Sequence, residues 1–123
     1  MVLEASPLQK NVVIGLSEVS VDDNTYSVLS KQHSASFTAT ANQPPVWVAC
    51  DQVVDPQNLG AILRTSMFLG VDGVVVCNKN SAPLSAVVAK ASVGALEARP
   101  TYGVQSLMKF IQVFFCQLLS CGF

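Results

Sequence analysis

Two apolar runs, each followed by a segment with helical periodicity, most constrain the fold of this chain. The runs are residues 46–50 and 74–77, and neither contains a polar residue. A strand without polar alternation is typical of a parallel sheet that is covered on both faces. The segments that follow repeat apolar residues every three or four positions, as amphipathic helices do. The alternation predicts an α/β fold in which right-handed crossovers join the strands of a parallel sheet.

Turn and capping residues predict where these elements begin and end. Asp55 and Pro56 predict the start of a helix over 56–69, because Asp caps helix N-termini and Pro suits the first helical position. Gly70 ends this helix before the strand near 73–77. The later elements expected are a helix over 84–97, a strand over 101–104 and a helix from Gln105 to about Gln112. The apolar residues expected to face the core are Leu59, Ile62, Leu63 and Met67 on the first helix, and Leu84, Val87, Val88, Ala91 and Ala95 on the second.

The first part of the chain is polar. Residues 10–45 are rich in Ser, Thr, Asn and Asp and show no sustained strand or helix period. We expect a linker here, with strand fragments near Val12–Leu16 and Thr25–Leu29. The total length of 123 residues leaves room for one small domain rather than two.

Charge is unevenly divided along the chain. The formal net charge is −1, so a general polyanion-binding surface is excluded as the main feature. Residues 1–57 carry two Lys against six Asp and Glu, whereas residues 58–123 carry five Lys and Arg against two acidic residues. The second half could therefore face phosphate, and the first half could not easily do so.

Missing motifs disfavour several classes of protein. The four cysteines form no Cys-x-x-Cys pair and His33 is the one histidine, so we predict no metal site and reduced, buried thiols. No Gly-x-Gly-x-x-Gly, Walker loop or Gly-x-Ser-x-Gly elbow occurs, which disfavours dinucleotide-binding enzymes, P-loop enzymes and hydrolases. The longest apolar stretch, 107–123, is interrupted by polar residues and predicts no membrane span, and the N-terminus does not resemble a signal peptide.

The loops that follow the two strands contain the main candidate residues. In open parallel sheets, ligands bind beyond the carboxyl ends of the strands, so loops 51–59 and 78–84 should frame any site. Asn58 lies in the first helical turn, where its amide could cap backbone donors or hold a ligand. Gly60 would let another backbone come close, and Arg64 is a permanent cation suited to phosphate or to a developing oxyanion. The simpler alternative is a capped helix with a solvated Arg64.

The second helix contains weaker candidates. Lys90 is either a solvated charge or a contact for RNA phosphate. A glycine inside a helix costs about 1 kcal/mol against alanine. Gly94 therefore suggests close packing, with Glu97 reaching back to a loop or to Arg64. Glu97 is equally well explained as a surface residue near a frayed helix end.

A longer pattern emerges from residues 51–97. They contain D-P-x-N-x-G-A-I-x-R-T, followed by S-x-P-L and K-A-S-x-G-A-x-E. Over residues 46 to about 104, this pattern resembles the SpoU/TrmH family of RNA 2′-O-ribose methyltransferases in the SPOUT superfamily. The resemblance is to organellar and bacterial enzymes that methylate a guanosine ribose in large-subunit rRNA.

The resemblance implies specific partners and roles. The cofactor would be S-adenosylmethionine, the substrate large-subunit rRNA, the assembly a homodimer, and the parent protein mitochondrial, otherwise organellar, or cytoplasmic. Arg64 and Asn58 would be the catalytic residues, with Arg64 assisting deprotonation of the target 2′-hydroxyl and holding the neighbouring phosphate. The RNA contacts implied are Arg64, Lys90, Ser92 and Glu97.

The resemblance does not extend to the cofactor motifs. Family members continue with G-N-E-x-x-G and L-N-V-S segments that thread the S-adenosylmethionine-binding trefoil knot, and neither segment occurs here. The fold class we expect is therefore α/β, the N-terminal half of an open parallel SPOUT (α/β knot) sheet without the knot and with an irregular N-terminal leader. Residues 2–8 resemble the last strand of a small RNA-binding domain, and the end of the chain resembles nothing in the family.

These resemblances divide the chain into four expected segments. They are the end of a truncated RNA-binding domain at 1–9, a linker at 10–45, a partial SpoU methyltransferase domain at 46–112 and a divergent apolar tail at 113–123. Two functions stay open: an RNA 2′-O-ribose methyltransferase, or a catalytically inactive fragment or splice product with weak RNA-binding or dimerisation ability. A generic α/β binding domain with no role toward RNA is a third alternative.

Overall fold

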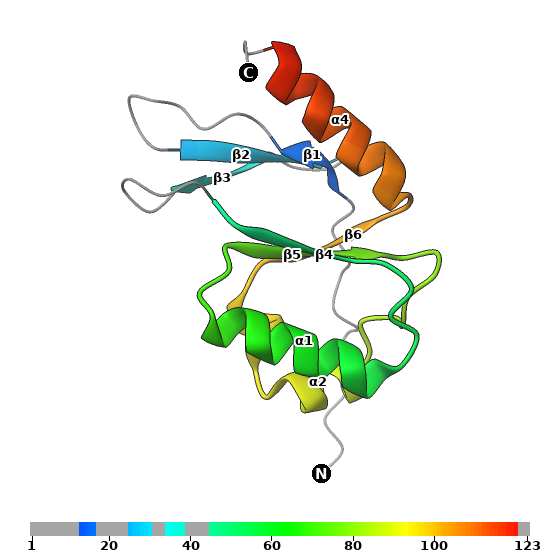
Figure 1. Ribbon diagram of the computed structural model, residues 1–123. Helices are drawn as coiled ribbons and strands as arrows, with labels where there is room; N and C mark the ends of the chain where they lie inside the picture. Colours follow the sequence, from blue (N-terminus) through cyan, green and yellow to red (C-terminus); the bar gives the residue numbers. More distant parts are fainter. Residues whose placement is uncertain (1–12, 17–24, 31–33, 39–44, 121–123) are drawn as a thin grey trace.

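The computed structural model describes residues 13–16, 25–30, 34–38 and 45–120 (Figure 1). The expected segment at 1–9 lies outside the described residues. The described elements, in chain order, are β1 (Val13–Leu16), β2 (Thr25–Ser30), β3 (Ser34–Thr38), β4 (Trp47–Cys50), α1 (Pro56–Phe68), β5 (Gly73–Cys77), α2 (Ala86–Ser92), α3 (Ala95–Ala98), β6 (Thr101–Val104) and α4 (Leu107–Ser120).

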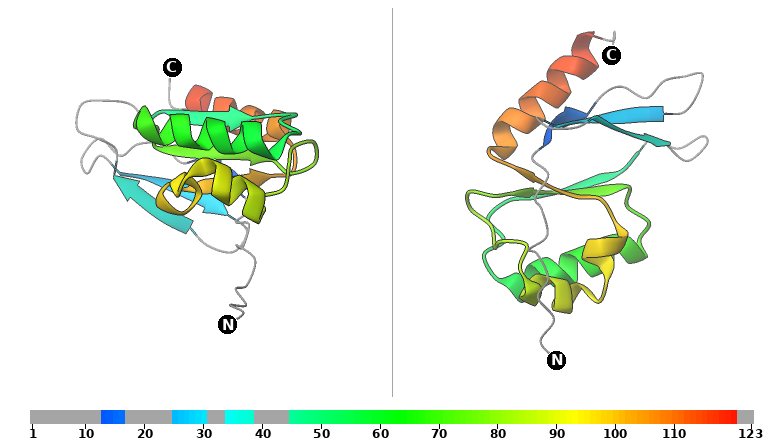
Figure 2. Two further views of the ribbon diagram at one scale, coloured as in Figure 1. Left: turned by 90° about the horizontal axis from the view of Figure 1, so that it is seen from below. Right: turned by 180° about the vertical axis from the view of Figure 1, so that it is seen from behind.

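The predicted parallel α/β sheet is confirmed. Its strand order is β4-β5-β6, and both strand pairs are parallel, with Trp47 opposite Gly73 and Val75 opposite Tyr102. Figures 1 and 2 show α1 and α2 together on one face of this sheet and the β1–β3 strands with α4 on the other. All five residues of β5 are buried, as expected for the central strand of a sheet covered on both faces.

The main core lies between the parallel sheet and the helices on one face. Cys50, Val74 and Val76 point from the sheet towards Leu59 and Leu63 of α1, and Val88, Ala95 and Leu96 complete the cluster. Two residues expected in the core are instead exposed: Met67 by 41% and Val87 by 51%. Met67 lies in the last turn of α1, and Val87 faces a surface groove between α1 and α2.

The sequence predicts one continuous helix over 84–97, but the second crossover contains two helices. It is divided into α2 and α3 by Val93 and Gly94, which have φ angles of 52° and 86°. Gly94 has no atom within 4 Å of the position that a Cβ would take, so the predicted close packing there is wrong. This glycine instead supplies a left-handed backbone conformation that turns the chain between the helices.

The polar first part contains more regular structure than expected. β1, β2 and β3 form an antiparallel sheet in that order, with Tyr26 opposite Phe37. The strand fragments predicted near Val12–Leu16 and Thr25–Leu29 correspond to β1 and β2. The third strand was not predicted, because its Ser-rich sequence gives little apolar alternation. The leader is therefore irregular only in part.

The last described element is longer than predicted. We expected a helix ending near Gln112, whereas α4 continues to Ser120 and packs beside β1. No Gly or Pro interrupts residues 107–120, so nothing in the backbone ends the helix at 112. The boundary expected at 113 therefore has no break in secondary structure. None of the helices in the described residues is long and apolar enough to cross a membrane.

Candidate functional site

The two loops at the carboxyl edge of the parallel sheet are joined to each other. The Ala82 amide donates to the Val53 carbonyl at 2.8 Å, and the Val53 amide donates to the Ser81 hydroxyl oxygen at 3.3 Å. The loops expected at 51–59 and 78–84 thus meet at this edge, as parallel topology requires. Asn78 also lies here, and its side-chain amide occupies the position that a Cβ at Gly103 would take.

The start of α1 is capped by Asp55, as predicted. Its carboxylate accepts hydrogen bonds from the Gln57 amide at 3.4 Å and from the Asn58 amide at 3.3 Å. Asn58 is exposed, and no hydrogen bond engages its side chain within the described residues. Because Asp55 does the capping, the Asn58 carboxamide is free to contact a ligand.

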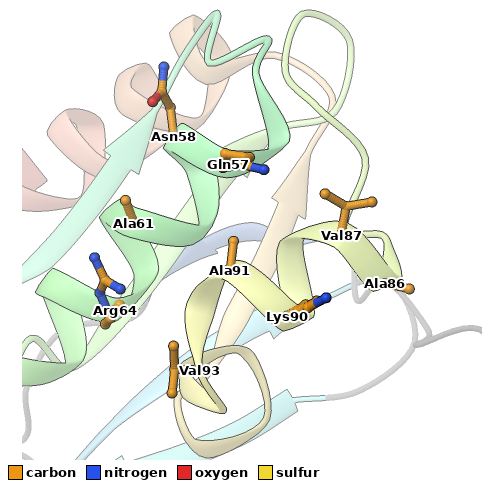
Figure 3. Close-up of a pocket in the computed structure, with 9 residues that line it drawn as sticks. All are labelled: Gln57, Asn58, Ala61, Arg64, Ala86, Val87, Lys90, Ala91 and Val93. Atoms are coloured by element: carbon orange, nitrogen blue, oxygen red, sulfur yellow. The ribbon is translucent and has the colours of Figure 1, made fainter.

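Arg64 lies on the same helix and does not meet Asn58. Six residues correspond to about 9 Å along a helix axis. Figure 3 shows the Asn58 side chain directed away from Arg64, with Ala61 between them. Arg64 is exposed, and in the described part of the chain it forms no ion pair with Glu97. The expected contact between Glu97 and Arg64 is therefore absent from this structure.

An open groove of about 820 Å³ lies between α1 and α2. We call it the α1–α2 groove, and its lining residues are Gln57, Asn58, Ala61, Arg64, Ala86, Val87, Lys90, Ala91 and Val93 (Figure 3). It contains Asn58, Arg64 and Lys90 from the sequence prediction. None of residues 78–81 lines it, so the loop that was expected to share a site with Arg64 is not part of this groove.

Gly60 allows the two helices to approach closely. A Cβ at Gly60 would lie 2.4 Å from the Ala91 Cβ, 2.9 Å from the Ala91 carbonyl carbon and 3.0 Å from the Ser92 nitrogen. The prediction that Gly60 admits a neighbouring backbone is confirmed. The α1–α2 groove therefore has a closely packed base, and this contact fixes the distance between the two helices that form its walls.

The other predicted RNA contacts are differently placed. Ser92 is fully buried, and its hydroxyl donates to the Ala89 carbonyl at 2.9 Å and accepts from the Leu96 amide at 3.3 Å. It connects α2 to α3 and faces no solvent in this structure. Glu97 is exposed on α3 and does not line the α1–α2 groove.

Sequence reasoning missed Gln57 and Val93 as groove residues. The signal for Gln57 was its spacing from Ala61 and Arg64, because residues four and seven apart share a helix face. No equivalent signal existed for Val93. Its position depends on the left-handed turn after α2, which valine rarely adopts.

The lining residues define what the groove can bind. It has two permanent or near-permanent cations and two carboxamides, but no carboxylate and no aromatic ring. Such a surface attracts anions, and the guanidinium of Arg64 suits phosphate oxygens. Among the described residues, no cluster of three His, Cys, Asp or Glu side chains could hold a metal ion. Cys50 and Cys77 are free and buried, and burial raises the pKa of the Cys50 thiol.

Comparisons with known proteins agree with this chemistry. A sequence profile of the SpoU rRNA Methylase family matches residues 45–117. The chain is 34% identical over 120 residues to "rRNA methyltransferase 1, mitochondrial" of Schizosaccharomyces pombe, an alignment that covers 91% of this chain and 39% of that protein. It is 43% identical over 67 residues to the human protein of the same name, covering 54% of this chain and 19% of that protein.

The chain also matches a bacterial relative over part of its length. The chain is 49% identical over 61 residues to a "Putative TrmH family tRNA/rRNA methyltransferase" of Staphylococcus aureus, covering 50% of this chain and 25% of that protein. The aligned parts of these three relatives thus amount to between 19% and 39% of their lengths.

Proposed function

Because this chain belongs to the SpoU rRNA methylase family, we propose that it is part of an RNA 2′-O-ribose methyltransferase that acts on rRNA. The observation that carries the proposal is the α1–α2 groove. It has Arg64 and Asn58 of the family motif on one wall, and its cations face no carboxylate among the lining residues. The relatives named as rRNA methyltransferases support the choice of RNA over other polyanions.

Arg64 would act by electrostatics rather than as a base. A guanidinium does not lose its proton in the physiological range, so it cannot itself accept the proton of the 2′-hydroxyl. A fixed cation lowers the free energy of the oxyanion as the 2′-hydroxyl proton leaves to water. The Asn58 carboxamide, which points away from Arg64, can donate a hydrogen bond to another oxygen of the bound RNA. The proposed role of Asn58 is thus to position the RNA, and that of Arg64 is to stabilise the developing charge.

S-adenosylmethionine is the methyl donor that the family resemblance implies. The described residues do not fit it as a complete site, because a ligand of this size needs a concave pocket that buries most of its surface. The α1–α2 groove is open, and at the carboxyl edge the loops from 51 and 78 are bonded to one another rather than spread around a cavity. We therefore derive no step through the cofactor from these residues.

A second candidate function is a catalytically inactive chain that binds RNA weakly. The same groove supports it, because phosphate contacts by Arg64 and Lys90 need no methyl donor. We also propose that the parent protein is mitochondrial or otherwise organellar, since the human and fission yeast relatives carry "mitochondrial" in their names.

The test compares methyl transfer with stability. A chimera in which residues 45–117 replace the matching segment of the human relative is assayed by single-turnover methylation of an rRNA transcript. We expect transfer to a ribose 2′-oxygen in the parent chimera and a loss of at least a hundredfold with Arg64→Ala, the size typical of one lost oxyanion contact. Lys109→Ala, an exposed cation outside the groove, is the control.

Two results would contradict the assignment. The Arg64→Ala chimera could stay active, or it could lose activity only because it unfolds at the assay temperature. Thermal melting of each variant beside the activity measurement separates these cases. A parent chimera that binds the transcript but transfers no methyl group would favour the second candidate function.

A further inference from the structure

We propose that one end of the α1–α2 groove is a nucleobase subsite, in which the Gln57 carboxamide hydrogen-bonds the edge of one RNA base and Val87 contacts its face. Adenine is the base that this subsite fits best. The inference rests on the proposed function, because it takes RNA as the substrate. Gln57 stands at an unspecified position of the D-P-x-N pattern, so the family resemblance assigns it no role.

The Gln57 side chain faces the groove and is not used by the protein itself. Figure 3 shows it extending from α1 towards Val87, whereas the side chain of Asn58 points in another direction. Gln57 is exposed, and no hydrogen bond engages its carboxamide within the described residues. The backbone amide of Gln57 donates to Asp55, so the cap of α1 leaves the carboxamide free. A donor group and an acceptor are therefore available to a ligand in the groove.

Val87 forms the wall that Gln57 faces. The apolar periodicity of the sequence predicts it in the core, yet it is 51% exposed and lines the groove. Its neighbour Ala86 and the next turn's Ala91 are also aliphatic and also line the groove. Ligand sites combine apolar walls with a few polar groups that fix orientation. An aliphatic wall opposite a free carboxamide suits a flat ligand with an apolar face and a polar edge, and a nucleobase has both.

The cations of the groove do not distinguish one base from another. Arg64 lies seven residues after Gln57, about 10 Å further along the helix axis, and Figure 3 shows it towards the other end of the groove. Lys90 lies three residues after Val87, so a cation flanks the apolar wall. Cations attract the phosphates of every RNA sequence alike. Discrimination among bases therefore depends on the Gln57 carboxamide.

Hydrogen-bond matching makes adenine the preferred base. A carboxamide binds with two hydrogen bonds where a base presents a donor beside an acceptor. Adenine presents such a pair on both of its edges, because its N6 amine lies between the N1 and N7 acceptors. Cytosine and uracil present a pair on the Watson–Crick edge alone, and the N7 edge of guanine has two acceptors. The adenine ring also covers more of Val87 than a pyrimidine ring does.

The test measures which homopolymer the chain prefers. The full 123-residue chain is titrated into fluorescein-labelled oligo(A), oligo(C) and oligo(U) of twelve nucleotides at one salt concentration, with fluorescence anisotropy as the readout. One bidentate amide contact discriminates between bases by about fivefold or more. We therefore expect oligo(A) to bind at least about fivefold more tightly than oligo(U). Gln57→Leu keeps the size of the side chain but removes both hydrogen bonds, so it should abolish this preference.

Gln57→Glu should change the preferred base. A carboxylate only accepts hydrogen bonds, and it suits the cytosine amine better than the adenine amine, which has an acceptor on either side. The preference should therefore move from oligo(A) to oligo(C). The matched control is Gln112→Glu, because Gln112 is an exposed helical glutamine on α4, on the opposite side of the parallel sheet (Figure 1). It should keep the preference of the parent chain, and Lys90→Gln should weaken all three oligonucleotides equally.

Several outcomes would overturn the inference. They are equal binding of the three oligonucleotides by the parent chain, no saturable binding of any of them, an unchanged preference in Gln57→Leu, and the same change of preference in Gln112→Glu as in Gln57→Glu. Circular dichroism spectra equal to that of the parent show that the variants are folded. Methyl transfer by the chimera does not depend on these ratios. An active chimera with no base preference would refute the subsite alone, and an inactive chimera with the expected ratios would refute the proposed methyl transfer alone.

Discussion

Replacing Gly60 by alanine should force α1 and α2 apart. The new Cβ would lie 2.4 Å from the Ala91 Cβ, whereas carbon atoms in good contact are about 3.5–4.0 Å apart. The other two nearest atoms, at 2.9 and 3.0 Å, belong to the backbone of α2 and cannot rotate away. The helices must therefore separate by about 1 Å or more.

The expected cost is the balance of two opposing effects. Overpacking a closely packed contact costs about 1–3 kcal/mol, and the backbone contacts place Gly60→Ala in the upper part of this range. Alanine gains about 1 kcal/mol of helix propensity over glycine. We expect a net loss of about 1–2 kcal/mol in the free energy of unfolding, and a larger loss for Gly60→Val.

Urea unfolding followed by tryptophan fluorescence measures this loss. Trp47 is the one tryptophan of the chain, and its ring stacks on Tyr102 with centroids 5.8 Å apart. Strand alternation places it on the sheet face away from α1, so it reports global unfolding rather than the substituted contact. For a chain of this size, each kcal/mol lowers the melting temperature by about 3–5 °C, so the expected loss corresponds to a fall of about 3–10 °C.

A double variant identifies the cause. Ala91→Gly removes the nearest opposing atom, so Gly60→Ala combined with Ala91→Gly should lose less stability than the sum of the two single variants. The sign of the single variant is decisive. If Gly60→Ala were as stable as the parent or more stable, the free energy of unfolding would reflect only the gain in helix propensity. That result would refute the close contact between the helices.

Three further predictions concern stability, reactivity and cofactor binding. Val93→Gly should stabilise the chain by about 0.5–1 kcal/mol in urea unfolding, because relief of left-handed strain exceeds the entropy of the added glycine, whereas Val87→Gly in regular helix should destabilise it. Cys50 should react with iodoacetamide far more slowly in the native chain than in the unfolded chain, and equally fast labelling of the two states would contradict its burial. Because burial raises the pKa of this thiol, the free energy of unfolding should decrease as the pH rises above the thiol's unfolded pKa of about 8.5. Isothermal titration of the 123-residue chain with S-adenosylmethionine should show no binding, and a micromolar dissociation constant would prove that the described groove and loops form a complete pocket.

The parallel sheet and its first crossover follow from local features of the amino-acid sequence. The runs at 46–50 and 74–77 are apolar throughout, and only a strand covered on both faces requires this. Asp55 and Pro56 specify the start of α1 through local interactions with the next few amides. Such features depend on neighbours in the chain, so they can be read without knowledge of the fold.

Other elements could not be predicted, because their causes are not local. The turn between α2 and α3 needs Val93 in a left-handed conformation that valine disfavours. Hydrogen bonds of the buried Ser92 hydroxyl stabilise this turn. The strand β3 has a weak apolar pattern and exists through its pairing with β2. Intrinsic backbone and strand propensities disfavour both the turn at Val93 and the strand β3.

Which candidate residues share a site depends on the packing of α1 against α2. Asn58 and Arg64 are on one helix but point apart, and Lys90 joins them through the approach of α1 to α2. That approach rests on contact between Gly60 and Ala91, residues far apart in the chain. Motif spacing fixes positions along a helix, whereas a groove between helices depends on how closely their backbones pack, and here the absent side chain of Gly60 sets that distance.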